Sequence, residues 1–179
     1  ANQGYKMPIN YFQKIEDNER NVLREMAPFK IKEIDPAIAY IISDILSDNF
    51  ARTFAFGPGS SLEIPGYKVA VKTGTTNDKK DNWTIGYTPE FLVTVWVGNN
   101  DNTPMNPYLT SGITGASPIW NRVMTYLLKN YGTSNKWFEK PDNIVEKNCY
   151  YGRKEYFVKG TENSANCNQA SLATPTPTP

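Results

Sequence analysis

The chain has 179 residues, with 19 lysines and arginines against 18 aspartates and glutamates, and it contains no histidine. The near-neutral charge argues against a nucleic-acid partner and against attachment to anionic lipid through basic residues. The lack of histidine excludes Ser-His-Asp and Cys-His catalysis and any histidine-ligated metal. We therefore expect neither a metal nor a cofactor. Hydrophobic residues make up 39% of the chain, enough for a packed core, and no apolar run approaches the roughly 18 residues of a membrane span.

The first part of the chain predicts a β-hairpin followed by a helix. Apolar and aromatic residues fill 7–15 and 22–29, and the polar stretch 16–21 separates these two strands. A helix is predicted to start at Asp35-Pro36, since Asp is a good N-cap and Pro suits the first helical position. Apolar residues at helical spacing predict one buried stripe, which consists of Ile38, Ile41, Ile42, Ile45 and Leu46 and continues to Phe50.

Three consecutive strands are predicted next, at 67–73, 83–87 and 91–97. The third reads Phe-Leu-Val-Thr-Val-Trp-Val and is apolar on both faces, so we expect it to be the central strand. A loop then leads to a second amphipathic helix over 116–131. Because both helices need a sheet to bury their stripes, the predicted fold class is α/β of the α+β type, an antiparallel sheet with helices packed on its faces.

The character of the chain changes after Gly132. Residues 132–172 are polar with scattered aromatics, and 173–179 form a Thr/Pro-rich tail that we expect to be extended and flexible. Cys149 and Cys167 both lie in the polar stretch, at a spacing that suits a local disulfide worth about 3 kcal/mol. Such a bond would imply an oxidising compartment. Two free surface thiols are the alternative.

The most informative segment is 72–77, which closes a predicted strand with Lys72, Thr73, Gly74, Thr75, Thr76 and Asn77. Side chains alternate along a strand, so the hydroxyls of Thr73 and Thr75 share one side. Gly74 lets another backbone approach closely. A cation, two hydroxyls and open strand-edge amides suit an extended peptide that ends in a carboxylate. From the residues alone, a solvated strand end with a Thr-rich turn is the alternative.

Lys72-Thr73-Gly74 resembles the third signature motif of penicillin-binding proteins and serine β-lactamases. Longer strings resemble the class A (bifunctional) penicillin-binding proteins, the peptidoglycan synthases, and these strings lie at 72–78, 81–89, 95–101 and 115–120. Residues 14–17 and 35–40 are similar to the same family, so the resemblance covers about residues 5–131. It implies the β-lactamase-like fold of a penicillin-binding-protein transpeptidase domain.

The resemblance also implies a serine D-Ala-D-Ala transpeptidase, which cross-links peptidoglycan stem peptides through an acyl-enzyme and is acylated by β-lactams. Lys72 and Thr75 would then be catalytic: Lys72 supplies positive potential, and the Thr75 N–H forms half of an oxyanion hole. The substrate-binding residues would be Thr73, Gly74, Thr75 and Asn77, with the threonine hydroxyls on the terminal carboxylate. We expect Trp83 and Tyr87 to be core or strand-face residues rather than substrate contacts.

The chain departs from the family's pattern in one respect. The family's nucleophile lies in an S-x-x-K motif upstream of K-T-G, and no serine here is followed by lysine three places later. Ser47-Asp48-Asn49 and Ser164-Ala165-Asn166 match the letters of the second motif, S-x-N. We do not favour the first as the family's motif, although it stays an alternative, and we interpret the second as a chance match. One falls at the end of a predicted helix, and the other follows K-T-G.

We therefore expect an incomplete domain, the C-terminal part of a transpeptidase domain over 1–131, inactive alone. The catalytic serine, a glycosyltransferase domain and the N-terminal membrane anchor of an extracytoplasmic protein would lie upstream. Such a piece is expected to expose apolar surface and to associate with itself or with the missing N-terminal part.

Two other functions are alternatives. A serine β-lactamase or carboxypeptidase has a helical subdomain and a nucleophile before the K-T-G motif. The stretch before Lys72 is too short to contain them. A non-catalytic cell-wall or partner-binding module on the same sheet scaffold remains an alternative, with residues 132–170 as its appendage.

Overall fold

A three-stranded antiparallel sheet forms the centre of the computed structural model, which describes residues 1–133, 136–149, 152–164 and 167. Its strands follow the order β5 (Ala70–Thr75), β6 (Asp81–Tyr87) and β7 (Leu92–Gly98). The prediction that 91–97 is the central strand is wrong, because β6 lies between the other two. Although β7 is apolar on both faces, only Val93 is buried, and Leu92 and Trp96 stay exposed on the other face.

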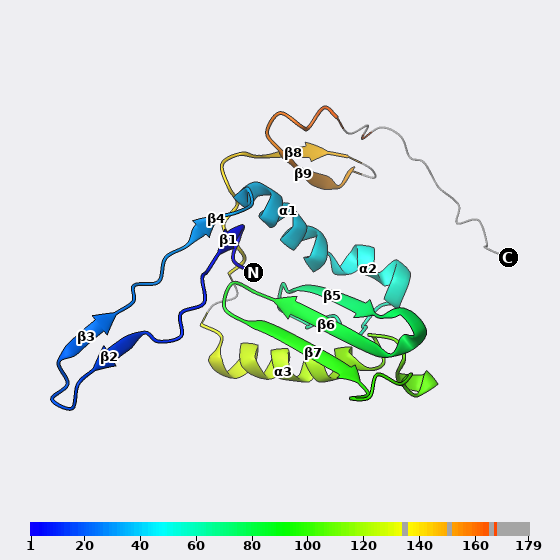
Figure 1. Ribbon diagram of the computed structural model, residues 1–179. Coiled ribbons are helices and arrows are strands. Elements are labelled where there is room, and N and C mark those ends of the chain that lie inside the picture. The colour runs from blue at the N-terminus through cyan, green and yellow to red at the C-terminus, as the bar shows by residue number, and fades with distance from the viewer. Residues whose placement is uncertain (134–135, 150–151, 165–166, 168–179) are drawn as a thin grey trace.

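Three α-helices accompany this sheet, and Figure 1 shows α1 and α2 along the β5 side with α3 against the strands on the other side. Their bounds are α1 Pro36–Ser47, α2 Asn49–Phe56 and α3 Ala116–Tyr131. Two 3₁₀ turns, η1 (Asn77–Lys79) and η2 (Pro107–Leu109), lie in the connections. The predicted α+β arrangement, a sheet with helices on its faces, is therefore confirmed, and so is the helix over 116–131.

The main hydrophobic core lies between α3 and the sheet. Trp120, Met124 and Leu128 recur every four residues on one face of α3, and all three are buried. They pack with Val71 of β5 and with other apolar residues, among them Leu62, Ile64, Val69 and Val93. The core therefore fixes the inner face of β5 just before Lys72.

Helix α1 begins as predicted but buries a different face. The Asp35 carboxylate caps it by accepting a hydrogen bond from the Ala37 N–H at 2.8 Å. The predicted stripe is wrong in large part, since Ile38, Ile42 and Ile45 are 47%, 49% and 61% exposed. The helix ends at Ser47, and Phe50 is an exposed residue of α2. The buried positions of α1 are instead Ala37, Tyr40 and Ser43.

A hairpin from the polar C-terminal stretch covers that face of α1. Strands β8 (Ile144–Asn148) and β9 (Lys154–Val158) pair antiparallel above the helix (Figure 1). Ile144 packs on Tyr40, whose ring meets that of Tyr156 edge-on with centroids 5.7 Å apart. Burial raises the pKa of Tyr40 to about 12. The described part of 132–172 is therefore packed onto the helix, while 173–179 lie outside the described residues.

A disulfide joins Cys149, just after β8, to Cys167 beyond β9. Because the two cysteines are 18 residues apart in sequence, we expect reduction of the disulfide to lower the free energy of unfolding by about 3 kcal/mol. The β8–β9 hairpin and its contacts with Tyr40 should be the first part of the structure to be destabilised. Urea unfolding with and without reductant measures the difference, with a Cys149→Ser/Cys167→Ser variant as the reductant-insensitive control. Equal midpoints for oxidised and reduced chain would contradict the expectation.

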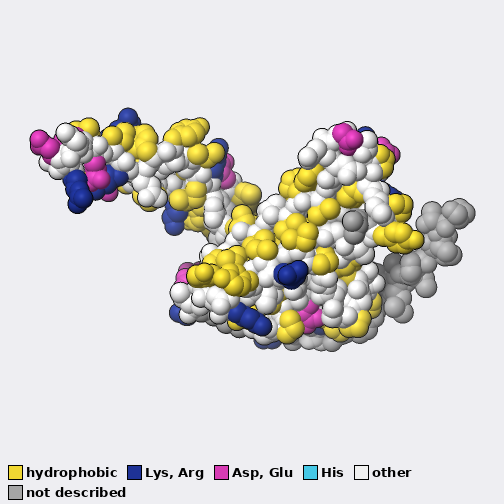
Figure 2. All heavy atoms as spheres, turned by 90° about the horizontal axis from the view of Figure 1, so that it is seen from below, with side chains coloured by type: hydrophobic (Ala, Val, Ile, Leu, Met, Phe, Trp, Pro, Cys, Tyr) yellow, Lys and Arg dark blue, Asp and Glu magenta, His cyan; other side chains and the backbone are white. Residues whose placement is uncertain are grey.

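The N-terminal residues form an arm that projects from the body, as Figure 1 shows at the left. It consists of two short antiparallel pairs: β1 (Tyr5–Lys6) with β4 (Ile31–Lys32), and β2 (Lys14–Glu16) with β3 (Val22–Glu25). The predicted hairpin is confirmed, although its strands are shorter than predicted. Many apolar side chains are exposed on the arm and the body (Figure 2), including Ile9, Tyr11 and Leu23.

Candidate active site

Strand β5 carries the K-T-G segment at the edge of the sheet. Thr73 lies opposite Thr84, and Thr75 lies opposite Asn82, in the antiparallel register with β6. Both partners on β6 are fully buried on the α3 side. Since side chains of paired residues share a face, Thr73 and Thr75 lie on one side of the strand, as predicted.

Lys72 and Gly74 lie on the other face of β5. Lys72 is exposed, and its Nζ donates to the Thr73 carbonyl at 2.5 Å. A Cβ built on Gly74 would meet only the Cβ of Trp83, at 3.9 Å, so the space beside it is open. The geometry therefore leaves room for the close approach of a second backbone at Gly74.

The end of β5 reveals the direction of its amides. The Thr76 N–H donates to the Asp81 carbonyl at 3.1 Å, so it points towards β6. In an antiparallel ladder, successive residues of a strand direct their N–H and C=O groups alternately to its two sides. The Thr75 N–H therefore points away from β6, towards the open edge, as does the Thr73 carbonyl that Lys72 contacts.

A cleft lies beside this open edge. Its volume is about 270 Å³, and it separates β5 from the junction of α1 and α2. Val71, Lys72 and Thr73 line one side, while Leu46, Asp48 and Arg52 line the other. The structure thus brings Lys72 and Thr73 together at a cleft, with Gly74 and Thr75 following along the same exposed strand end.

Asn77 lies beyond the strand, at the start of η1. It is exposed, and the two residues after it have positive φ angles of 60° and 55°. The turn is closed by the Thr76 hydroxyl, which accepts from the Asp81 N–H at 3.1 Å. Residues 77–79 are exposed, and they leave Asn77 near the end of β5 rather than on it.

Residues of the strings at 81–89 and 115–120 hold α3 against the sheet. Asn82 is fully buried, and its Oδ1 accepts from the Ala116 N–H at 2.9 Å, at the helix N-terminus. A Cβ on Gly115 would come within 2.4 Å of Asn82 Nδ2. The buried hydroxyls of Thr84 and Ser117 lie 2.9 Å apart. These residues have a structural role that holds β6, and through it β5, in register.

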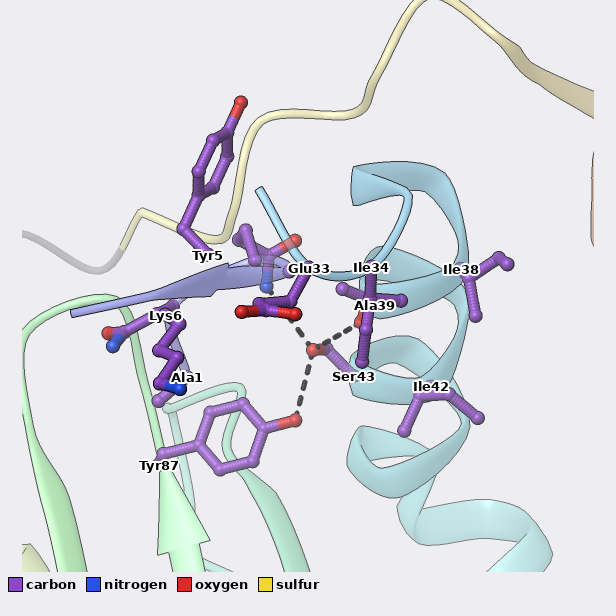
Figure 3. A pocket seen from close by; sticks show the side chains of 13 residues that line it. Ala1, Tyr5, Lys6, Glu33, Ile34, Ile38, Ala39, Ile42, Ser43 and Tyr87 are labelled. Carbon is purple, nitrogen blue, oxygen red and sulfur yellow. Dashed lines mark hydrogen bonds between the residues drawn. The ribbon is translucent and has the colours of Figure 1, made fainter. Parts of the chain in front are cut away.

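Trp83 and Tyr87 lie on the β6 face turned away from α3, consistent with strand-face residues. Figure 3 shows the Tyr87 hydroxyl reaching Ser43 of α1, at 3.0 Å. This pair lines a second pocket, of about 370 Å³, between α1 and the first residues of the chain. None of the predicted site residues lines this pocket.

The Ser47-Asp48-Asn49 match forms the junction of α1 and α2. The Ser47 hydroxyl donates to the Asp44 carbonyl at 2.8 Å, and Asp48 caps α2 by accepting from the Ala51 N–H at 2.9 Å. Burial opposes the charge of Asp48, but that N–H and the paired guanidinium of Arg153 hold its pKa below the usual range. These contacts give the tripeptide a structural role at the cleft wall. The Ser164-Ala165-Asn166 match lies partly outside the described residues.

Arg52, on the cleft wall, was not predicted as a site residue. The sequence offered one weak signal for it, an arginine one helical turn after Asn49. Within the described ranges, no group of three or more His, Cys, Asp and Glu side chains could hold a metal ion. Similarly, no described helix has the length and apolarity to cross a membrane.

Comparisons with known proteins identify the family of the chain. A family model described as the penicillin binding protein transpeptidase domain matches residues 1–125. Penicillin-binding protein 1A of Neisseria lactamica is 33% identical over 163 residues, which cover 88% of this chain and 20% of the relative. Penicillin-binding protein 1A/1B of Bacillus subtilis is 28% identical, with 90% and 20% covered. The chain therefore spans about a fifth of the length of these curated relatives.

Solved structures share the fold. Penicillin-binding protein 1A from Haemophilus influenzae superposes with a TM-score of 0.74 at 23% identity, over 90% of this chain and 30% of that one. Penicillin-binding protein A from M. tuberculosis, solved as an imipenem acyl-enzyme complex, gives a TM-score of 0.50 at 23% identity, over 69% and 27%. With the family model matching well over half of the residues, the chain belongs to the penicillin-binding protein transpeptidase domain family.

Proposed function

We propose that β5 is the K-T-G strand of a serine D-Ala-D-Ala transpeptidase that cross-links peptidoglycan stem peptides and is acylated by β-lactams. The observation that carries the proposal is an open edge strand that offers a cation, two hydroxyls and an outward amide beside a cleft. Family membership supports the reaction class, and the imipenem acyl-enzyme complex of the M. tuberculosis protein supports acylation by β-lactams.

Each residue of the segment has a proposed part. The hydroxyls of Thr73 and Thr75 hold the terminal carboxylate of the donor peptide or drug, and exposed Lys72 adds positive potential. The outward Thr75 N–H is one donor of the oxyanion hole. Gly74 lets the donor backbone lie along the strand, and Asn77 contacts the substrate at the end of the strand.

The nucleophile has to come from elsewhere, because no serine of this sequence has lysine three places later. We propose that an S-x-x-K serine and its lysine lie on another part of the same protein, with 1–131 as the C-terminal portion of the transpeptidase domain. The Cys149–Cys167 disulfide suits an oxidising, extracytoplasmic location. A membrane anchor and a glycosyltransferase domain would belong to the same larger protein.

Labelling with a fluorescent penicillin tests the proposal. In the complete protein, the serine hydroxyl attacks the lactam carbonyl, its proton passes to the ring nitrogen, and the ring-opened acyl group stays bound through denaturing electrophoresis. The chain alone should show no label, and excess unlabelled penicillin should abolish the label of the complete protein. A stoichiometric label on the chain alone would refute the absence of a nucleophile, and an unlabelled complete protein would refute the reaction.

The second candidate is a non-catalytic module that binds cell wall. The lack of an S-x-x-K motif in the chain favours it, as does the packing of the C-terminal hairpin onto α1. Co-sedimentation with insoluble peptidoglycan, together with the penicillin label, separates the candidates. A module would bind without any covalent penicillin label on the complete protein, and binding would fall when residues 132–179 are removed.

A further inference from the structure

The guanidinium of Arg52 lies in the wall of the cleft beside β5. Its Nη2 donates to the Leu46 carbonyl in the last turn of α1 at 2.6 Å. Its Nη1 donates to the Leu62 carbonyl at 3.2 Å and to the Asn49 side chain at 3.1 Å. One half-buried side chain therefore ties the end of α1, the start of α2 and the segment before β5 to each other.

Leu62 links this tie to the K-T-G strand. Its side chain is 2% exposed and belongs to the same core cluster as Val71, the neighbour of Lys72. Leu62, Val71 and Lys72 also line the same cleft as Arg52. A shift of the Leu62 backbone relative to α1 would therefore change both the wall of the cleft and the packing that supports β5.

The chemistry of arginine suits this position. The last carbonyls of a helix lack partners within the helix, so Leu46 needs an external donor. A planar guanidinium can serve three acceptors at fixed angles, whereas a lysine ammonium is a compact point charge that cannot span them. Desolvation lowers the pKa of Arg52, which marks the degree of its enclosure, while Asp48 and Glu63 oppose that shift.

We propose that Arg52 is a positioning residue, which sets the separation of the α1–α2 junction from β5 and so holds Lys72 to Thr75 in place for the donor peptide. This inference deepens the proposed transpeptidase function and rests on it for the identity of the ligand. Arg52 acts through the carbonyls of Leu46 and Leu62, and it is not a group that reacts.

Amide hydrogen exchange of the full chain, without ligand, tests the positioning directly. The variants are Arg52→Gln and Arg52→Lys, with Arg122→Gln on the exposed outer face of α3 as the control. We expect both Arg52 variants to speed exchange at Lys72 and Gly74, whose amides face β6, by about tenfold or more. Exchange at Trp120 and Met124 of α3 should change by less than twofold, and the control should match wild type.

Each result of the exchange experiment either supports or overturns the positioning role of Arg52. Any one of four results would overturn the positioning role. These are unchanged exchange in β5, exchange raised only within α2, full rescue by Arg52→Lys, and an equal rise in β5 and α3. If Arg52→Gln fails to fold, Asn49→Ala removes one of the three acceptors instead. It should raise β5 exchange by about threefold, and no rise there would also overturn the role.

A titration with an acetylated peptide ending in D-Ala-D-Ala separates this inference from the proposed function. Wild-type chain should show amide shifts at Thr73 and Thr75, and Arg52→Gln should weaken that binding about fivefold or more. Absence of binding by wild type would count against the proposed function of the strand, and the exchange data would still decide the role of Arg52. Equal affinities for wild type and variant would overturn the inference alone.

Discussion

Replacing Gly86 by alanine should destabilise the chain more than a substitution at any other glycine of the central sheet. A Cβ there would lie 2.2 Å from Cζ2 of Trp120, and that ring is fully buried in the core. Overpacking a filled core costs roughly 1–3 kcal/mol, and a bulky indole has nowhere to move, so we expect a loss of about 3 kcal/mol. Urea unfolding followed by tryptophan fluorescence measures it.

Gly74→Ala is the matched control, because Gly74 sits in the neighbouring strand with open space where a Cβ would be. In a strand, alanine costs less conformational entropy than glycine, so stability should be unchanged or slightly raised. Gly86→Ala should cost less stability in a Trp120→Leu background than in wild type, because the smaller side chain relieves the contact. Equal losses at Gly74 and Gly86, or an equal cost of Gly86→Ala in both backgrounds, would show that the Trp120 contact is not the cause.

The sequence predicted the elements whose signals are local. Helix α3 is bounded as predicted because Gly115 and Gly132 flank a regular apolar period. Alternation along a strand was enough to place Thr73 and Thr75 on one side. The strings around Asn82 and Gly115 were recognised as a resemblance, and their physical reason, a buried amide that caps α3, required the structure.

Long-range contacts explain what could not be predicted. The spacing of isoleucines showed that α1 is amphipathic, but the hairpin that covers Tyr40 comes about a hundred residues later and settles on the other face. Similarly, the apolar run of β7 indicated two buried faces, but strand order depends on pairing partners that the run does not encode. Arg52 could not be predicted as a site residue for the same reason. Its partner, the Leu62 carbonyl, comes next to it only when the loop folds.

Thr75→Pro should remove the proposed oxyanion donor of β5 while leaving the sheet intact. The Thr75 N–H points away from β6, and proline is tolerated on an edge strand where its missing N–H faces outwards. Loss of one oxyanion donor typically lowers the rate constant by about 100- to 1,000-fold. We expect a decrease of that size in the rate of penicillin acylation, measured by stopped-flow on the complete protein that supplies the serine.

Thr75→Ala separates the backbone donor from the hydroxyl. It keeps the N–H and loses only a contact to the terminal carboxylate, so acylation should slow by about tenfold, with the loss mainly in affinity for the drug. Thermal unfolding of both variants should stay within a few degrees of wild type, since neither change touches the β5–β6 ladder. If the Thr75→Pro protein is acylated as fast as the Thr75→Ala protein, the Thr75 N–H does not stabilise the developing oxyanion. The outward direction of this N–H would then have no role in catalysis.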